Sequence, residues 1–347
     1  MARDAGYKQS EGSKPTIYSL AREAGVSIAT VSRALRDDPA VSPATRQQIQ
    51  DLARQLGYRR SPLATRLAGG KTGMIAMVLP TVRNPFYAAL AGAVMTEARK
   101  SDHEVLIAYA EIDAAHERHI LETFRQAHVD GYIVVPQFWA ENRDVAAALT
   151  REPGGRPVVV RDELDPDDPF DAIYVDMQRA ACEATGYLIR LGHRRIAYLG
   201  YSTAQPSGGR PAGFAQAMQN AGLDVRFQHI GCGTYVEHAC AAARQLLADY
   251  RPTALVVQSD YHAQGVLRAA AEMGLSVPRD LSVISFDGIE LAGYGTVPLT
   301  TMAQPLDDVA AALVQCLLDR IKGDNSPPRR QLFPMRMIER NSTAPPP

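Results

Sequence analysis

Hydrophobic residues beyond Gly73 occur in short continuous runs, separated by longer stretches in which they recur at helical spacing. The short runs are typical of strands buried on both faces, and the longer stretches of amphipathic helices. This alternation predicts an α/β fold with parallel sheets covered by helices, and its length fits two sheets. The expected strands cover 74–80, 104–110, 131–136, 157–162, 172–176, 195–200, 254–260 and 281–287, and the expected helices include 87–100, 114–127, 178–191, 235–248 and 261–273.

A different pattern occupies the first sixty residues, where three short helices are each preceded by a residue able to cap them. Thr16, Ser27 and Ser42 are the expected caps, because their hydroxyls can accept the first free backbone N–H groups. Gly25 can end the first helix in a left-handed turn. The helices are expected to end at Ala24, Leu35 and Leu56. Two short helices joined by a tight glycine turn and supported by a third predict a helix-turn-helix.

The second of these helices carries candidate DNA-reading side chains. Val31 and Leu35 share one face and are expected to pack inward, which leaves Arg33 pointing outward. Arginine can bind guanine O6 and N7 in the major groove, apolar side chains can contact a thymine methyl, and hydroxyls can bind phosphates. Arg33 is the candidate for binding guanine. Ile28 and Ala29 are the candidates for contacting a thymine methyl. The candidates for binding phosphates are Tyr18, Ser27, Thr30 and Ser32.

Charge is distributed unevenly along the 347 residues, although the net charge is only −1. Residues 15–71 carry a net charge of +5 and residues 72–347 a net charge of −7. A basic module joined to an acidic body favours nucleic acid as one partner. Residues 1–14 have the composition of a flexible tail and lack the apolar core of a secretory signal, and no apolar run is long enough to span a membrane. Four cysteines without CxxC spacing indicate reduced thiols, so we expect a cytoplasmic protein.

No catalytic, metal or cofactor motif emerges from the chain. The "GCGTYV" segment begins like a dinucleotide-binding loop, but Val236 occupies the position of its third glycine. His116 and His119 are spaced three apart around Glu117, and an exposed helix face is the favoured interpretation of that pattern. We therefore expect no enzyme, no metal and no cofactor.

The amino-terminal module resembles that of the lactose-repressor (LacI/GalR) family of regulators. The resemblance rests on the run A-x-x-A-G-V-S-x-x-T-V-S-R-x-L, followed by V-S-x-x-T-R and L-G-Y, and continues from Pro15 to about Arg340. It implies a helix-turn-helix domain over 15–61, a hinge helix or linker over 62–72, and a periplasmic-binding-protein-like effector and dimerisation domain over 73–347. The resemblance further implies that Leu67 wedges into the minor groove of the operator.

Three chain crossings are expected between the two lobes of the effector domain, near residues 172, 302 and 325. Lobe 1 would comprise about 73–171 and 303–325, including a helix from Pro305 to Lys322. Lobe 2 would comprise about 172–302 and 326–340, ending in the strand "QLFPMRMIER".

The carboxyl ends of the strands are expected to line a cleft between the lobes, because ligands of open parallel sheets bind there. The R-x-x-G-F signature shared with the family places Arg210 in this cleft. A guanidinium facing carboxylates can bind hydroxyls or a small anion. The candidate effector-binding residues are Asn84, Phe86, Tyr87, Arg210, Ser259, Asp260 and Asp287.

Some positions depart from the family pattern. Ser259-Asp260 stands where the family often has Asn-Asp, and Gly233 stands where an aromatic residue commonly stacks on a pyranose in sugar-binding members. The missing aromatic weakens the prediction of a pyranose ligand.

Together these features predict a repressor that binds a palindromic double-stranded DNA operator as a homodimer and responds to a small-molecule effector, a sugar or sugar derivative. The carboxyl end, "NSTAPPP", lacks the heptad repeat of a tetramerising coiled coil. A purine or other non-sugar effector, and corepression in place of induction, remain alternatives. A transporter-associated substrate-binding protein and an enzyme on a doubly wound fold are the rival classes.

Overall fold

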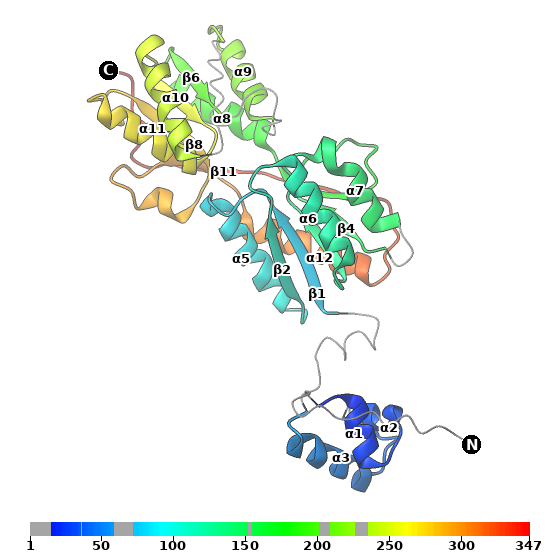
Figure 1. Ribbon diagram of the computed structural model, residues 1–347. Coiled ribbons are helices and arrows are strands. Elements are labelled where there is room, and N and C mark those ends of the chain that lie inside the picture. The colour runs from blue at the N-terminus through cyan, green and yellow to red at the C-terminus, as the bar shows by residue number, and fades with distance from the viewer. Residues whose placement is uncertain (1–14, 36, 59–71, 152–154, 201–208, 226–234) are drawn as a thin grey trace. The chain divides into compact units, whose positions relative to one another are not determined.

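The structure is a computed structural model that describes residues 15–35, 37–58, 72–151, 155–200, 209–225 and 235–347. The chain divides into two compact units, Met1–Thr72 and Gly73–Pro347 (Figure 1). Within the described residues, no helix is both long and apolar enough to cross a membrane. The predicted hinge residue Leu67 lies outside the described residues.

The first unit contains the three predicted helices, α1 (Ile17–Ala24), α2 (Ile28–Ala34) and α3 (Pro43–Gln55). All three predicted caps are confirmed, because the side chains of Thr16, Ser27 and Ser42 each accept a hydrogen bond from the backbone N–H three residues on. Gly25 ends α1 at a φ of 66°. The helices enclose a small core of Leu20, Ala21, Val31, Ala34, Val41, Ile49 and Ala53, against which Leu35 is only partly buried.

The second unit contains two sheets, and the first, sheet A, belongs to lobe 1. Its order is β10 (Arg330–Phe333), β5 (Asp171–Val175), β4 (Val158–Val160), β3 (Gly131–Val134), β1 (Met74–Leu79) and β2 (Glu104–Tyr109), all parallel. The helices packed on this sheet are α5 (Pro85–Arg99), α6 (Ala114–Gln126), α7 (Trp139–Arg151) and α12 (Leu306–Ile321), with α12 beside α5 and α6 beside α7 (Figure 1).

Sheet B belongs to lobe 2. Its order is β11 (Arg336–Ile338), β9 (Thr300–Ala303), β8 (Ser282–Asp287), β7 (Ala254–Val257) and β6 (Ile196–Leu199), in which only β11 is antiparallel to its neighbour. The helices α8 (Met177–Arg190), α9 (Arg210–Asn220), α10 (Val236–Asp249) and α11 (Asp260–Glu272) pack with it as the pairs α8–α9 and α10–α11. A short 3₁₀ helix, η1 (Glu290–Gly293), follows β8. The predicted fold class, a helix-turn-helix followed in the chain by two mostly parallel sheets covered by helices, is confirmed.

The expected crossing near residue 172 is wrong, because β5 belongs to lobe 1. The Asp171 carboxylate accepts hydrogen bonds from Nε and Nη2 of Arg320, each 2.8 Å long, and from the backbone N–H of Arg329 at 2.7 Å. These contacts tie β5 to the end of α12 and to β10, so the chain crosses only after Val175.

The expected crossing near residue 325 is also misplaced. The segment "QLFPMRMIER", expected to be one final strand, forms two strands, β10 and β11. β10 pairs with β5 in lobe 1, whereas β11 pairs with β9 in lobe 2. Pro334 stands between them, and proline interrupts a strand because it has no N–H to donate. The crossing therefore occurs at residues 334–335. Strand β9 and helices α7 and α9 were not predicted as elements.

Candidate functional site

The outer face of α2 carries most of the predicted DNA-contacting side chains. Ile28 has 42% of its surface exposed, and Ser27, Ala29 and Arg33 are also exposed; Tyr18, which lies on α1, is 70% exposed. Thr30 and Ser32 are half-buried, and the Thr30 hydroxyl lies 2.8 Å from that of Ser27. Val31 and Ala34 face the core, so the helix presents one apolar and one accessible face.

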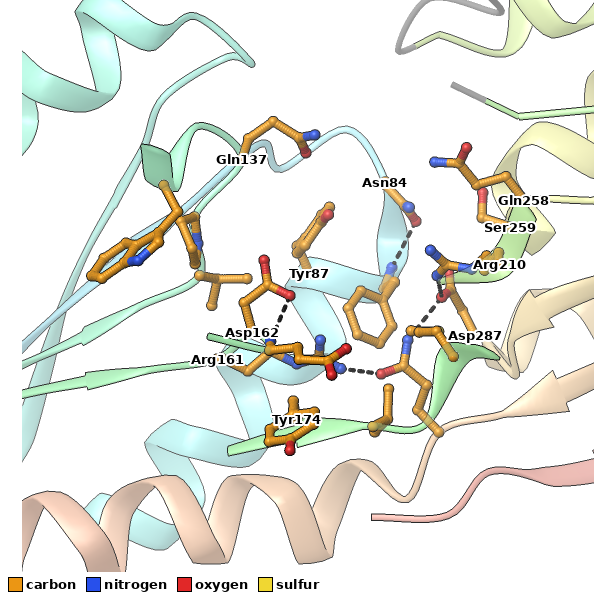
Figure 2. Close-up of a pocket in the computed structure, with 18 of the residues that line it drawn as sticks. Asn84, Tyr87, Gln137, Arg161, Asp162, Tyr174, Arg210, Gln258, Ser259 and Asp287 are labelled. Carbon is orange, nitrogen blue, oxygen red and sulfur yellow. Dashed lines mark hydrogen bonds and ion pairs between the residues drawn. The ribbon is translucent and has the colours of Figure 1, made fainter. Parts of the chain in front are cut away.

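A cavity of about 310 Å³ lies between the lobes of the second unit (Figure 2). Its walls come from segments that follow strands of both sheets, as expected for the carboxyl edges of parallel strands. The residues that line it are Asn84, Phe86, Tyr87, Val135, Pro136, Gln137, Phe138, Trp139, Ala140, Glu141, Arg161, Asp162, Glu163, Tyr174, Val175, Met177, Arg210, Gln258, Ser259, Asp287 and Gln304.

Arg210 and Asp287 meet in this cavity. Arg210 begins α9, and its Nη2 lies 3.8 Å from Oδ1 of Asp287, the last residue of β8. Nε2 of Gln304 donates a 2.9 Å hydrogen bond to the same oxygen. Burial raises the pKa of Asp287, although Arg210 and Gln304 act in the opposite direction. The backbone of Asp287 has a φ of 103°, a strained conformation of the kind that clusters at binding sites.

Asn84, Phe86 and Tyr87 line the cavity from the first turn of α5. Asn84 also caps this helix, because its Oδ1 accepts a 3.0 Å hydrogen bond from the Phe86 N–H. Burial, with a further contribution from Asp287, raises the pKa of Tyr87 to about 12. The Tyr87 hydroxyl is therefore protonated at neutral pH and can donate to a ligand.

Ser259 lines the cavity, whereas Asp260 does not. Ser259 caps α11, and its Oγ lies 2.7 Å from Nδ1 of His262. The Asp260 carboxylate is fully buried behind it, where it accepts hydrogen bonds from Ser285 Oγ at 2.5 Å and from the Ile289 N–H at 2.8 Å. The expectation that Asp260 faces the cleft is therefore wrong, because its side chain turns inward at the first position of the helix.

Arg161 and Asp162 are cavity residues that the sequence reasoning missed. They immediately follow β4, at the carboxyl end of the strand expected over 157–162. Their position at the carboxyl end of an expected parallel strand is the signal that could have identified both residues, because ligands bind at these ends. Gln137, Tyr174, Gln258 and Gln304 were missed as well.

Glu117 supports the lobe 1 wall of the cavity, although the sequence favoured an exposed position for it. Its carboxylate is almost fully buried and accepts hydrogen bonds from the Gln137 N–H at 2.9 Å and from Nδ2 of Asn142 at 3.0 Å. Glu117 thereby joins α6, α7 and the segment that carries Gln137. The described residues contain no cluster of three or more His, Cys, Asp or Glu side chains that could hold a metal ion.

Comparison with known proteins identifies both units. The model of the family described as "Bacterial regulatory proteins, lacI family" matches residues 16–61, and the model of a "Periplasmic binding protein-like domain" matches residues 185–343. The HTH-type transcriptional regulator DegA of Bacillus subtilis is 32% identical over 335 residues, which cover 96% of this chain and 99% of DegA.

Two solved structures extend the comparison. A lac repressor dimer bound to operator and the anti-inducer ONPF has a TM-score of 0.83 at 24% identity, covering 96% of this chain and all of that one. A LacI family transcriptional regulator from Enterococcus faecium with bound ribose has a TM-score of 0.70 at 27% identity, covering 78% of this chain and 99% of that one.

Proposed function

This chain belongs to the lacI family of bacterial regulatory proteins, and from that membership we propose that it represses transcription under the control of a small molecule. It is a DNA-binding transcriptional regulator and not an enzyme. In the proposed mechanism, two copies bind a palindromic operator in the cytoplasm and the interlobe cavity binds the effector.

DNA recognition is proposed to run through α2. Arg33 reads a guanine, Ile28 and Ala29 contact thymine methyl groups, and Tyr18, Ser27, Thr30 and Ser32 bind phosphates. The exposure of Arg33, on the face opposite the buried Val31, and of Ile28 in the first turn of the helix supports this assignment. A two-fold symmetric dimer requires two symmetric half-sites, which is why we propose a palindromic operator.

We propose that the effector binds in the cavity. The main support for this site is the Arg210–Asp287 pair, whose charged groups both line the cavity. Arg210 and Asp287 come from lobe 2, whereas Asn84 and Tyr87 come from lobe 1, so one ligand would contact both lobes. A ligand with unequal affinity for two lobe arrangements shifts the population between them. Ribose in the Enterococcus faecium relative supports a sugar or sugar derivative of similar size.

The test measures DNA binding by the full chain with and without effectors. Fluorescence anisotropy on operators selected from random duplexes should show sequence-specific binding, and members of a sugar library should change that affinity. Arg210→Ala should abolish the effector response and leave effector-free DNA binding unchanged. A protein that prefers no duplex, or a normal response in Arg210→Ala, would contradict the proposal.

A further inference from the structure

Arg161 is a buried arginine whose charge is not balanced by an ion pair. Only 9% of its surface is exposed, and it lines the cavity directly after β4. Nη2 of Arg161 donates a hydrogen bond to Oε1 of Gln304, which is a neutral amide, and its guanidinium carbon lies 5.7 Å from the centroid of the Phe86 ring. Within the described part of the chain, Arg161 forms no salt bridge.

The Nε–H of Arg161 is a buried donor that finds no hydrogen-bond acceptor among the described residues. Leaving a buried donor unsatisfied costs about 1–3 kcal/mol, and more when the group is charged. Arginine is almost never fully buried unless it is paired. The rest of the Arg161 side chain lines the cavity, so an anionic group bound there would balance the buried charge of the guanidinium.

The lining of the whole cavity holds four carboxylates, those of Glu141, Asp162, Glu163 and Asp287, and two guanidinium groups, but its floor beside Arg161 favours an anion. The floor of the cavity, defined as Arg161, Arg210, Asp287 and Gln304, holds two guanidinium groups and one carboxylate, and that carboxylate is already engaged by Arg210 and Gln304. Of these four residues, Figure 2 labels Arg161, Arg210 and Asp287. Asp162 is adjacent and half-buried, but its Oδ1 accepts a hydrogen bond from the Glu163 N–H at 2.8 Å. Burial raises the pKa of Asp162 to about 6, so this carboxylate is mostly ionised at neutral pH and offsets part of the Arg161 charge without forming a salt bridge with it in the described residues.

We propose that the effector carries an anionic group, a carboxylate or a phosphoryl group, and that Arg161 binds this group while the rest of the cavity binds a polyhydroxylated body. This inference rests on the proposed function, because it assumes that the cavity is the effector site. Charge-assisted hydrogen bonds from a guanidinium to a carboxylate or phosphate are among the strongest in proteins. Asp162, Gln137 and Tyr87 supply acceptors and donors for hydroxyl groups at the cavity wall.

The experiment compares neutral and anionic forms of the same sugars on the full chain. The panel contains D-glucose, D-gluconate and glucose 6-phosphate, together with D-ribose, D-ribonate and ribose 5-phosphate, measured by thermal shift and then by calorimetry. At least one anion should bind tenfold or more tightly than its neutral parent. Preferential binding of D-gluconate or D-ribonate would indicate a carboxylate ligand, and preferential binding of glucose 6-phosphate or ribose 5-phosphate would indicate a phosphoryl ligand.

Variants assign the preference to Arg161. Arg161→Met should remove the tenfold preference, and Arg161→Lys should keep part of it because a lysine retains the charge but not the guanidinium geometry. Arg268→Met is the matched control, because Arg268 is an exposed arginine on α11 that pairs with Glu272. If Arg161→Met fails to fold, the wild-type panel and Arg161→Lys still decide the question.

Three results would overturn the proposal: a neutral parent that binds as tightly as its anions, a panel in which no anion binds, or an unchanged preference in Arg161→Met. A neutral sugar that binds and alters operator affinity would refute the anionic effector but support the proposed function. Absence of sequence-specific DNA binding would instead refute the proposed function.

Discussion

Arg83 and Tyr235 contact each other between the two lobes of the effector domain, with the guanidinium carbon of Arg83 4.0 Å from the centroid of the Tyr235 ring. Arg83 precedes Asn84 at the start of α5, and Tyr235 precedes α10. A cation over an aromatic face contributes about 0.5–2 kcal/mol. The contact requires the lobes to be close, so it stabilises the arrangement that encloses the cavity.

We expect Tyr235→Ala to weaken effector binding about two- to tenfold, because closure of the lobes loses this contact. Calorimetric titration of the ligand identified by the sugar panel measures the effect. Tyr235→Phe is the matched control, since phenylalanine keeps the aromatic face, and should retain most of the affinity. Equal losses in both variants would show that the ring does not act through Arg83.

Gly213 allows α9 to pack closely against α8, and a substitution there should displace Arg210 without touching the cavity. A Cβ at Gly213 would lie 2.0 Å from the backbone oxygen of Gln178, so alanine forces the two helices apart. We expect Gly213→Ala to lower the free energy of unfolding by about 1–3 kcal/mol and to weaken the effector response. Urea denaturation and operator anisotropy measure the two effects.

Gly92 provides the control for this prediction, because it also lies inside a helix but has open space where a Cβ would stand. Gly92→Ala should leave the stability unchanged or raise it by up to about 1 kcal/mol. If Gly213→Ala changes neither the free energy of unfolding nor the effector response, the close approach of α8 and α9 does not constrain Arg210.

Arg33→Ala should reduce operator affinity by about 1–3 kcal/mol and relax specificity at one base-pair position in each half-site. The exposed position of Arg33 means that the fold of the helix-turn-helix should be unaffected. Anisotropy on operators substituted at each position checks the prediction. A uniform loss on all duplexes would assign Arg33 to phosphate contacts, with Ile28→Ala as a second probe of base contacts.

Local features of the fold were predictable because they depend on residues close in sequence. The capping hydroxyls of Thr16, Ser27 and Ser42 lie within three residues of the N–H groups that they bind. The buried strands of both sheets are likewise visible as continuous apolar runs. Sheet membership was not predictable in this way, because a run such as 171–175 looks the same in either lobe. Its partners in lobe 1, among them β10 and Arg320, come from far along the chain.

The cavity was predictable only in part for a similar reason. Asn84, Arg210 and Asp287 were found from strand ends and from the family signature, and Arg161 stood at a strand end that was not considered. Glu117 was misjudged because its burial comes from Asn142 on a helix that was not predicted.

Asp260 should make the stability of the effector domain depend on pH. Burial, with a further contribution from Asp287, raises its pKa from 3.8 to about 7. The folded state therefore binds a proton at this site more readily than the unfolded state. The resulting stabilisation is fully present below about pH 4 and is lost as the pH rises to about 7.

We expect the advantage of wild type over Asp260→Asn, in free energy of unfolding, to fall as the pH rises from 5 to 7. The slope should approach but not exceed roughly 1.4 kcal/mol per pH unit, because asparagine stays neutral throughout. Urea denaturation of both proteins at pH 5, 6, 7 and 8 gives the difference directly, and it should level off between pH 7 and 8. A difference that is constant from pH 5 to 8 would mean that Asp260 keeps its ordinary pKa, because the hydrogen bonds from Ser285 and Ile289 then offset its burial.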